Sequence, residues 1–168
     1  MLAALRRGRS TCERNRAGFA PAGGQVTAFV FAIASAGYLG FQWTIRLLVY
    51  PQFAQVPSQA FVAYAQEHQR RVSFVVGPLF LAQGLSALAV TVAPPDGVPW
   101  LLAVAALLSV GGVFAVTGLL AVPMHRRLST GWDEAAHRRL LRVDAVRLAL
   151  AAVSVVLACA LVMFEERT

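Results

Sequence analysis

Four long stretches of mostly apolar residues constrain the fold of this chain more than any other feature. They lie at about 26–50, 72–93, 100–122 and 145–164, and short polar or Pro- and Gly-rich segments separate them. At a rise of ~1.5 Å per residue, a helix over each stretch can cross or nearly cross a hydrocarbon core of ~30 Å. The chain is 58% apolar and 14% charged, whereas soluble domains are roughly 25% charged. The sequence therefore predicts an all-α membrane protein, a bundle of four transmembrane helices with a multi-pass location in the cell membrane.

The segments outside these stretches complete the predicted organisation. Residues 1–25 carry five Arg and two Pro- or Gly-rich clusters, which is typical of a disordered basic tail. This tail lacks the apolar core of a signal peptide. Residues 26–168 form the predicted membrane domain. Within it, Ser58 after Pro57 is expected to start a short amphipathic helix that runs into the second span.

Local signals set the expected helix ends. Pro51 and Pro123 are expected to end the first and third spans, and Pro78 is expected to kink the second by removing a backbone hydrogen bond. The fourth helix is expected to begin near Trp132, with Thr130 as its cap.

Two stripes of small residues predict close packing between helices. Small residues four or three positions apart let another helix backbone approach closely in lipid. The stripes are Ala28, Ala32, Ala36 and Gly40 in the first span, and Gly111, Ala115 and Gly118 in the third.

The basic residues are all Arg, and they give a net charge of +7. These Arg flank apolar spans, where they act as topology signals and contact lipid phosphate. We therefore expect membrane lipid as a partner and no nucleic acid. The Arg of the segments that follow the first and third spans favour a cytoplasmic location for those segments. The two cysteines form no CxxC pair, which argues against a thiol oxidoreductase of the four-helix membrane type.

Polar and aromatic residues concentrate in two segments, 46–71 and 123–147. One pair of spans separates these segments, so both are expected on the same side of the membrane. The residues expected to form a site there are Arg46, Tyr50, Tyr64, His68, Arg70, Arg71, Trp132, His137, Asp144 and Arg147.

Spacing predicts partners for several of these charges. Asp144 and Arg147 lie three positions apart and are expected to pair where their helix enters lipid, because an unpaired carboxylate there would be costly. Glu134 and Arg138 form a favourable i,i+4 pair. For Arg46 we favour a side chain that snorkels to the headgroups over one that faces the bundle interior.

His, Arg and aromatic residues together are compatible with three kinds of site: a metal site, a haem site and a site for an aromatic molecule. His68, His125 and His137 could hold a metal ion, but their spacing matches no compact ligand motif, which favours solvated or interfacial His. A bis-His haem usually needs His within the spans, which contain none. We therefore expect no metal and no cofactor.

A basic, aromatic pocket at the membrane edge suits an aromatic or quinone-like amphiphile better. Arg46, Arg71 or Arg147 would hold a phenolate or enolate oxygen by charge-assisted hydrogen bonds, and His68 or His137 would take the proton. The plainer interpretation, which remains open, is that these Arg only contact lipid phosphates.

Four short motifs follow one another in an order known from one family. LLVYPQF ends the first span, YAQEHQR precedes the second, VPMHRRL ends the third and GWDEAAHRRLLRVDAVR begins the fourth. Over about 26–162, this layout resembles the small four-helix membrane proteins of the anthrone-oxygenase-like group. Many members carry Asn after the Pro that closes the third span, where this chain has Met124 and His125.

The resemblance implies an oxygenase that converts a polyketide-like anthrone to an anthraquinone without a dedicated cofactor. The matching positions are His68, Arg70, Trp132, His137 and Arg147. The alternative class of function is a non-catalytic membrane component or accessory subunit. Its Arg-rich loops would contact lipid headgroups, a membrane partner or a second copy of the chain.

Overall fold

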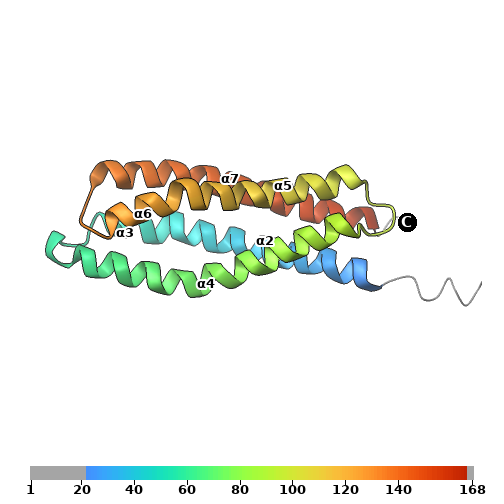
Figure 1. The fold of residues 1–168 in the computed structure, drawn as a ribbon, viewed down its shortest axis with the longest axis horizontal. Coiled ribbons are helices and arrows are strands. Elements are labelled where there is room, and N and C mark those ends of the chain that lie inside the picture. Colours follow the sequence, from blue (N-terminus) through green and yellow to red (C-terminus); the bar gives the residue numbers. More distant parts are fainter. Residues whose placement is uncertain (1–21, 166–168) are drawn as a thin grey trace, which may run out of the picture.

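Long helices packed side by side form one elongated bundle (Figure 1). The computed structural model describes residues 22–165. The first helix comprises α2 (Ala22–Thr44), η1 (Ile45–Val49) and α3 (Tyr50–Phe53), and the second is α4 (Ser58–Val92). The third comprises α5 (Trp100–Val116), η2 (Thr117–Ala121) and α6 (Val122–Leu128), and the fourth is α7 (Glu134–Glu165).

All four helices in this part of the chain are long and apolar enough to cross a membrane. The predicted all-α bundle of four transmembrane helices is therefore confirmed, and its length and composition are those of a multi-pass membrane protein. α2 begins at Ala22, inside the predicted basic tail, and residues 1–21 of that tail lie outside the described residues.

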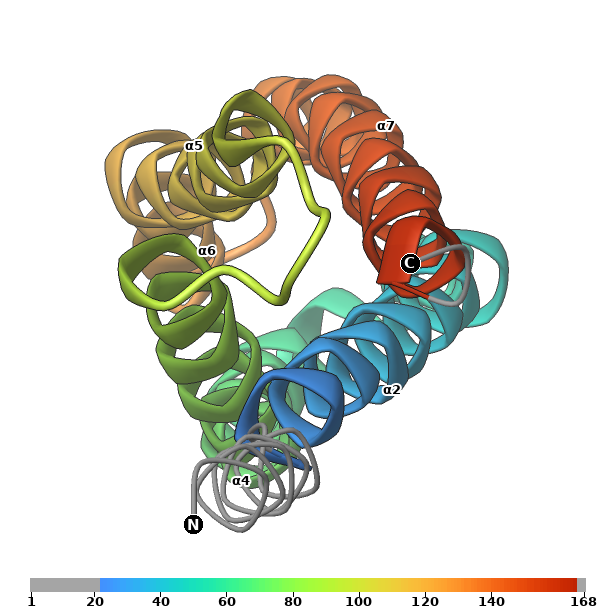
Figure 2. The same cartoon turned by 90° about the vertical axis from the view of Figure 1, so that its right-hand side faces the viewer.

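Seen along its length, the bundle has one helix at each corner (Figure 2). α2 contacts α4 and α7, and α5 contacts the same two helices. α2 begins and α7 ends at the same end of the bundle (Figure 1). Segments 54–57 and 129–133 lie at the opposite end, which we call the loop end.

The amphipathic segment before the second span is the first part of α4. Residues Ser58–Val92 form one helix, so this segment runs into the second span without a break. Pro78 lies inside α4, which changes direction midway along its length in Figure 1. A bend is the expected effect of a proline ring inside a helix.

Pro51 and Pro123 do not end their helices, contrary to the prediction. Each follows a π-helical turn: the N–H of Tyr50 bonds to the carbonyl of Ile45, and the N–H of Val122 bonds to the carbonyl of Thr117. The proline then occupies the start of a new helical segment, where its missing N–H costs little. The chain therefore stays helical as far as Phe53 and Leu128.

The small-residue stripes are not the packing faces of this bundle. Ala28 is buried, but Ala36 and Gly40 are exposed, and so are all three small residues of the α5 and η2 stripe. The buried face of α2 mixes small and large side chains, and its members are Ala28, Phe31, Ala34, Ser35, Tyr38 and Gln42.

Close helix approaches occur at other glycines. A Cβ on Gly84 would meet the ring of Phe114 at 3.1 Å, and a Cβ on Gly112 would meet the side chain of Leu150 at 3.3 Å. These two positions bring α4 against α5 and α5 against α7.

Asp133, rather than the predicted Thr130, caps α7. Its Oδ1 accepts a hydrogen bond of 2.9 Å from the N–H of Ala136. The Thr130 hydroxyl donates instead to the carbonyl of Arg127, 2.8 Å away. The Asp133 carboxylate also suits the positive end of the helix dipole. The predicted pair of Glu134 with Arg138 is present.

Candidate functional site

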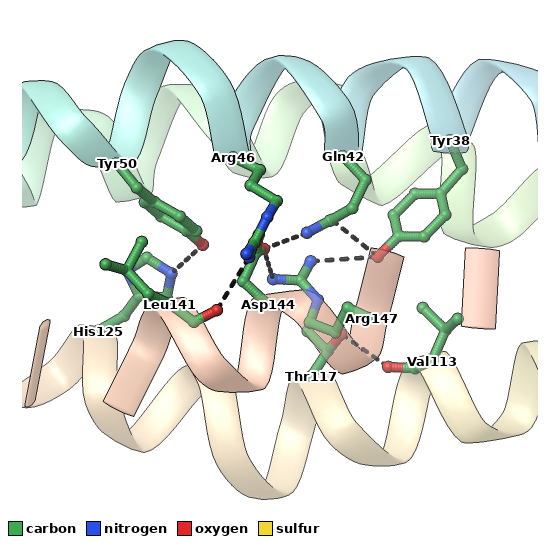
Figure 3. A network of polar contacts seen from close by, with 10 residues as sticks. All are labelled: Tyr38, Gln42, Arg46, Tyr50, Val113, Thr117, His125, Leu141, Asp144 and Arg147. Atoms are coloured by element: carbon green, nitrogen blue, oxygen red, sulfur yellow. Dashed lines mark hydrogen bonds and ion pairs between the residues drawn. The ribbon is translucent and has the colours of Figure 1, made fainter. Parts of the chain in front are cut away.

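A row of polar side chains follows the first helix at intervals of four residues. The row consists of Tyr38, Gln42, Arg46 and Tyr50, and Figure 3 shows it facing α7. Residues four apart lie on one face of a helix, so the row forms a single polar edge in an otherwise apolar span. Tyr38, Gln42 and Tyr50 are buried, and the Arg46 side chain is 34% exposed.

Asp144 on α7 is the centre of the network that this row enters (Figure 3). The carboxylate is fully buried, and its Oδ1 accepts a hydrogen bond from Nε2 of Gln42. Nη1 of Arg147 lies 3.7 Å from Oδ1, so the predicted pair of Asp144 with Arg147 is present. The free-energy cost of burying one carboxylate is thus offset by two Arg and an amide.

Arg46 points into the bundle, so the favoured prediction that it snorkels is wrong. Its Nη1 lies 3.6 Å from Oδ2 of Asp144 and donates a hydrogen bond of 3.0 Å to the carbonyl of Leu141. A buried carboxylate attracts a nearby guanidinium strongly, because the surrounding dielectric constant is low. The attraction of Arg46 to Asp144 on α7 is therefore stronger than its attraction to lipid headgroups.

Arg147 has an unusual environment for a charged side chain. Nη2 donates a hydrogen bond of 3.2 Å to the Tyr38 hydroxyl, which donates to Oε1 of Gln42 at 3.1 Å. The side chain is only 6% exposed. Its Nε is buried and has no hydrogen-bond partner among residues 22–165. Buried donors are nearly always paired, so this atom marks a place where an acceptor would be stabilising.

A cavity of about 270 Å³ lies beside Arg147. Its walls come from all four helices, at the level where η1 and η2 replace the regular α-helix. Ser73 and Val122, which are exposed, belong to the wall, so the cavity reaches the surface of the bundle between α4 and α6. The lining residues are Phe41, Ile45, Tyr50, His68, Gln69, Val72, Ser73, Val76, Thr117, Ala121, Val122, His125 and Arg147.

Tyr50, His125 and His68 form a connected group within this lining. The Tyr50 hydroxyl lies 3.3 Å from Nε2 of His125. The rings of His125 and His68 are stacked, with centroids 6.0 Å apart. Gln69 holds the backbone here, because its Nε2 donates to the His125 carbonyl at 3.2 Å. Two imidazoles and a phenol can exchange protons with a ligand in the cavity.

His137 lies in a different environment, in an aromatic cluster at the loop end. Its Nε2 is 3.0 Å from the carbonyl of Tyr50, and its ring packs against Phe53 and Trp132. Tyr64 meets Phe53 edge to face. The cavity wall includes none of the three predicted site residues in this cluster, which are His137, Trp132 and Tyr64. This cluster joins the start of α7 to the end of the first helix.

Arg70 and Arg71 are also away from the cavity. Both are exposed and pair with Glu67 on the same helix, at 2.7 and 2.5 Å. Of the predicted site residues, the structure thus brings Tyr50, His68 and Arg147 to the cavity. Arg46 and Asp144 lie in the charged network behind Arg147.

The site expected from the sequence did not include Tyr38, Gln42 or Gln69, and it included His125 only among the rejected metal ligands. The spacing of Tyr38 and Gln42 with Arg46 and Tyr50 was a usable signal, because it marks one helix face. His125 lies in VPMHRRL, which has the composition of a basic interface loop. The extension of the helix through Pro123 places it inside instead.

Metal ligands do not converge in the described part of the chain. Across residues 22–165, no group of three or more His, Cys, Asp or Glu is arranged so that it could hold a metal ion. The polar groups that line the cavity are guanidinium, imidazole, phenol, amide and hydroxyl groups.

Comparison of the chain with protein families, with curated proteins and with solved structures finds no match.

Proposed function

We propose that this protein, in the cell membrane, binds a hydrophobic aromatic molecule of the anthrone or quinone type in the cavity and oxidises it. The observation that supports this proposal most directly is the position of Arg147. A buried guanidinium with an unpartnered Nε lines a cavity that is otherwise largely apolar and aromatic. An aromatic ligand with one carbonyl or phenol oxygen matches both features.

The lining suggests how such a ligand would lie. Its rings would contact Phe41, Ile45 and Val76, and its oxygen would accept a hydrogen bond from the guanidinium of Arg147. His68 and His125 would be the groups that accept a proton. Ligand pockets usually measure about 300–1,000 Å³, so a cavity of about 270 Å³ favours a small ring system.

The reaction that the resemblance implies is the conversion of an anthrone to an anthraquinone by dioxygen. Both C–H bonds of the anthrone methylene group break, and that carbon forms a double bond to one oxygen atom. The other oxygen atom leaves with the two hydrogens as water. Removal of the first proton produces the anthrone enolate, whose negative oxygen is the group that Arg147 would stabilise.

Purified protein in detergent provides the test. Binding of anthrone, dioxygen uptake and the absorbance of anthraquinone are measured for the wild type and for Arg147→Gln. Arg142→Gln is the matched control, since Arg142 is exposed on the same helix. We expect binding and turnover in the wild type and the control, and the loss of both in Arg147→Gln. Binding of anthrone without turnover would show that the protein binds aromatic molecules, and it would contradict the oxygenase activity. The absence of both would contradict the proposal.

A role as a non-catalytic membrane component is the second candidate. The observation in its favour is a set of exposed Arg near the loop end: Arg126, Arg127, Arg138 and Arg139. Such a set attracts anionic headgroups or an acidic partner. If this is the main role, combined substitution of these Arg will abolish association with an acidic partner membrane protein. Arg147→Gln will then leave that association unchanged.

A further inference from the structure

The buried network next to the cavity contains more positive than negative charge. Asp144 is the carboxylate in contact with both Arg46 and Arg147. The groups that complete the network, Gln42 and Tyr38, contribute neutral hydrogen bonds. Two guanidinium groups therefore share one carboxylate.

The excess charge is located mainly at Arg147. Arg46 is one-third exposed and has a backbone carbonyl as a second acceptor. Arg147 is 6% exposed, and its nearest Asp144 oxygen is 3.7 Å away, which is longer than a hydrogen bond. A buried charge that is only partly compensated is costly in a membrane protein. A negative oxygen beside Arg147 would remove that cost.

We infer that the cavity takes its ligand as an anion: a ring-bearing weak acid that loses its O–H proton on binding. The inference rests on the proposed binding of an aromatic ligand, and it does not require the oxidation. The O–H bond breaks, its electron pair stays on the ligand oxygen beside Arg147, and the proton passes through His68 or His125 to the solvent.

Within residues 22–165, the titratable and charged groups that line the cavity are Tyr50 of α3, His68 of α4, His125 of α6 and Arg147 of α7. Those that contact Arg147 or its partner Asp144 are Tyr38 of α2 and Arg46 of η1. A lipid phosphate is the other source of an anionic oxygen. The aromatic lining favours a ring-bearing acid over a lipid headgroup.

The probe for this inference is 4-nitro-1-naphthol, whose phenolate absorbs at a longer wavelength than the neutral phenol. Protein in a neutral detergent is titrated with the probe, and the midpoint pH of ionisation is compared with that in empty micelles. An opposite charge at ~4–6 Å typically lowers such a midpoint by about 1–3 pH units, and we expect a shift of this size. The methyl ether of the probe, which cannot ionise, should bind at least about tenfold more weakly, the ratio for 1.4 kcal/mol.

Two variants change the charge in opposite directions, so general damage to the fold cannot imitate the result. Arg147→Gln should return the midpoint towards the value in empty micelles, whereas Asp144→Asn should lower it beyond the wild type. Arg142→Gln should behave as the wild type.

The outcomes separate this inference from the proposed function. Tight binding of both probes with no shift in the midpoint would overturn the inference and leave the binding of aromatic molecules intact. No binding of either probe would overturn both. Displacement of the naphthol by phosphatidylglycerol, but not by phosphatidylcholine, would identify a lipid anion as the ligand. It would overturn the inference that the ligand is a ring-bearing weak acid.

Discussion

Substitution of Asp144 by Ala tests the charged network most directly. Two different energies could determine how much stability this substitution removes. Hydrogen bonds between side chains of membrane helices contribute ~0.6 kcal/mol on average, whereas removal of one partner from a buried ion pair costs ~3–5 kcal/mol. Asp144 is fully buried, and Arg147 is 6% exposed, so the second energy dominates. We expect Asp144→Ala to lower the free energy of unfolding by about 3–5 kcal/mol.

A double variant separates the charge effect from the loss of packing. Asp144→Leu combined with Arg147→Met removes both members of the pair and replaces them with apolar side chains. Such replacements are often neutral or stabilising, so the double variant should be more stable than Asp144→Ala. Arg46 is one-third exposed and can then turn towards water.

Unfolding is measured by titrating sodium dodecyl sulfate into mixed micelles and following helix content by circular dichroism. Glu134→Ala is the control, because its pair with Arg138 is exposed and should contribute no more than ~1 kcal/mol. A loss of stability in Asp144→Ala no larger than that in Glu134→Ala would contradict the dominance of the buried charge. A double variant as unstable as Asp144→Ala would contradict it too.

Three further changes test other parts of the structure. His137→Ala should lower the free energy of unfolding by ~1–3 kcal/mol, because the Tyr50 carbonyl loses its partner. Thermal unfolding measures this loss of stability, and His137→Gln should recover part of the lost stability. Ser73→Trp should close the cavity where it reaches the surface; naphthol binding should fall while the melting temperature stays unchanged, and Ser73→Ala should bind normally. Gly84→Val should destabilise the bundle by ~1–3 kcal/mol through overpacking against Phe114. Gly77→Ala meets no atom within 4 Å and should be neutral or stabilising by up to ~1 kcal/mol in the same unfolding assay.

The number and type of the helices followed from the sequence because lipid imposes them. A long apolar stretch in a bilayer must satisfy its backbone internally, which leaves helix as the solution for each span. The helix ends were harder to predict. A proline normally ends a helix, but the π turns before Pro51 and Pro123 change the backbone bonding, and residue composition does not encode that change.

The candidate site was predicted only in part, for a reason that concerns helix faces. The stripe containing Ala36 and Gly40 lies two residues out of step with the row containing Tyr38 and Gln42. Two residues correspond to about 200° around a helix, so the stripe and the row lie on opposite sides. Small residues alone suggested the wrong face, whereas the buried polar residues mark the inner one.

Charge pairs within one helix were predictable because spacing along the sequence determines them. Asp144 with Arg147 and Glu134 with Arg138 are both of this kind. The contacts of Arg46 with Asp144 and of Tyr50 with His125 join different helices. They depend on how the helices are rotated in the bundle, and a single sequence does not determine that rotation.

The matching π turns have a consequence for how any ligand would be oriented. The halves of the chain repeat one backbone plan, with LLVYP in the first and LLAVP in the second, but their side chains differ. The first half presents Gln42, Arg46 and Tyr50 along its turn, and the corresponding positions of the second half are Phe114, Gly118 and Val122. The cavity between these halves is polarised, because Arg147 of α7 supplies its charged wall, whereas Phe41, Ile45 and Val76 supply an apolar wall. A molecule with one polar edge would fit this cavity in a single orientation.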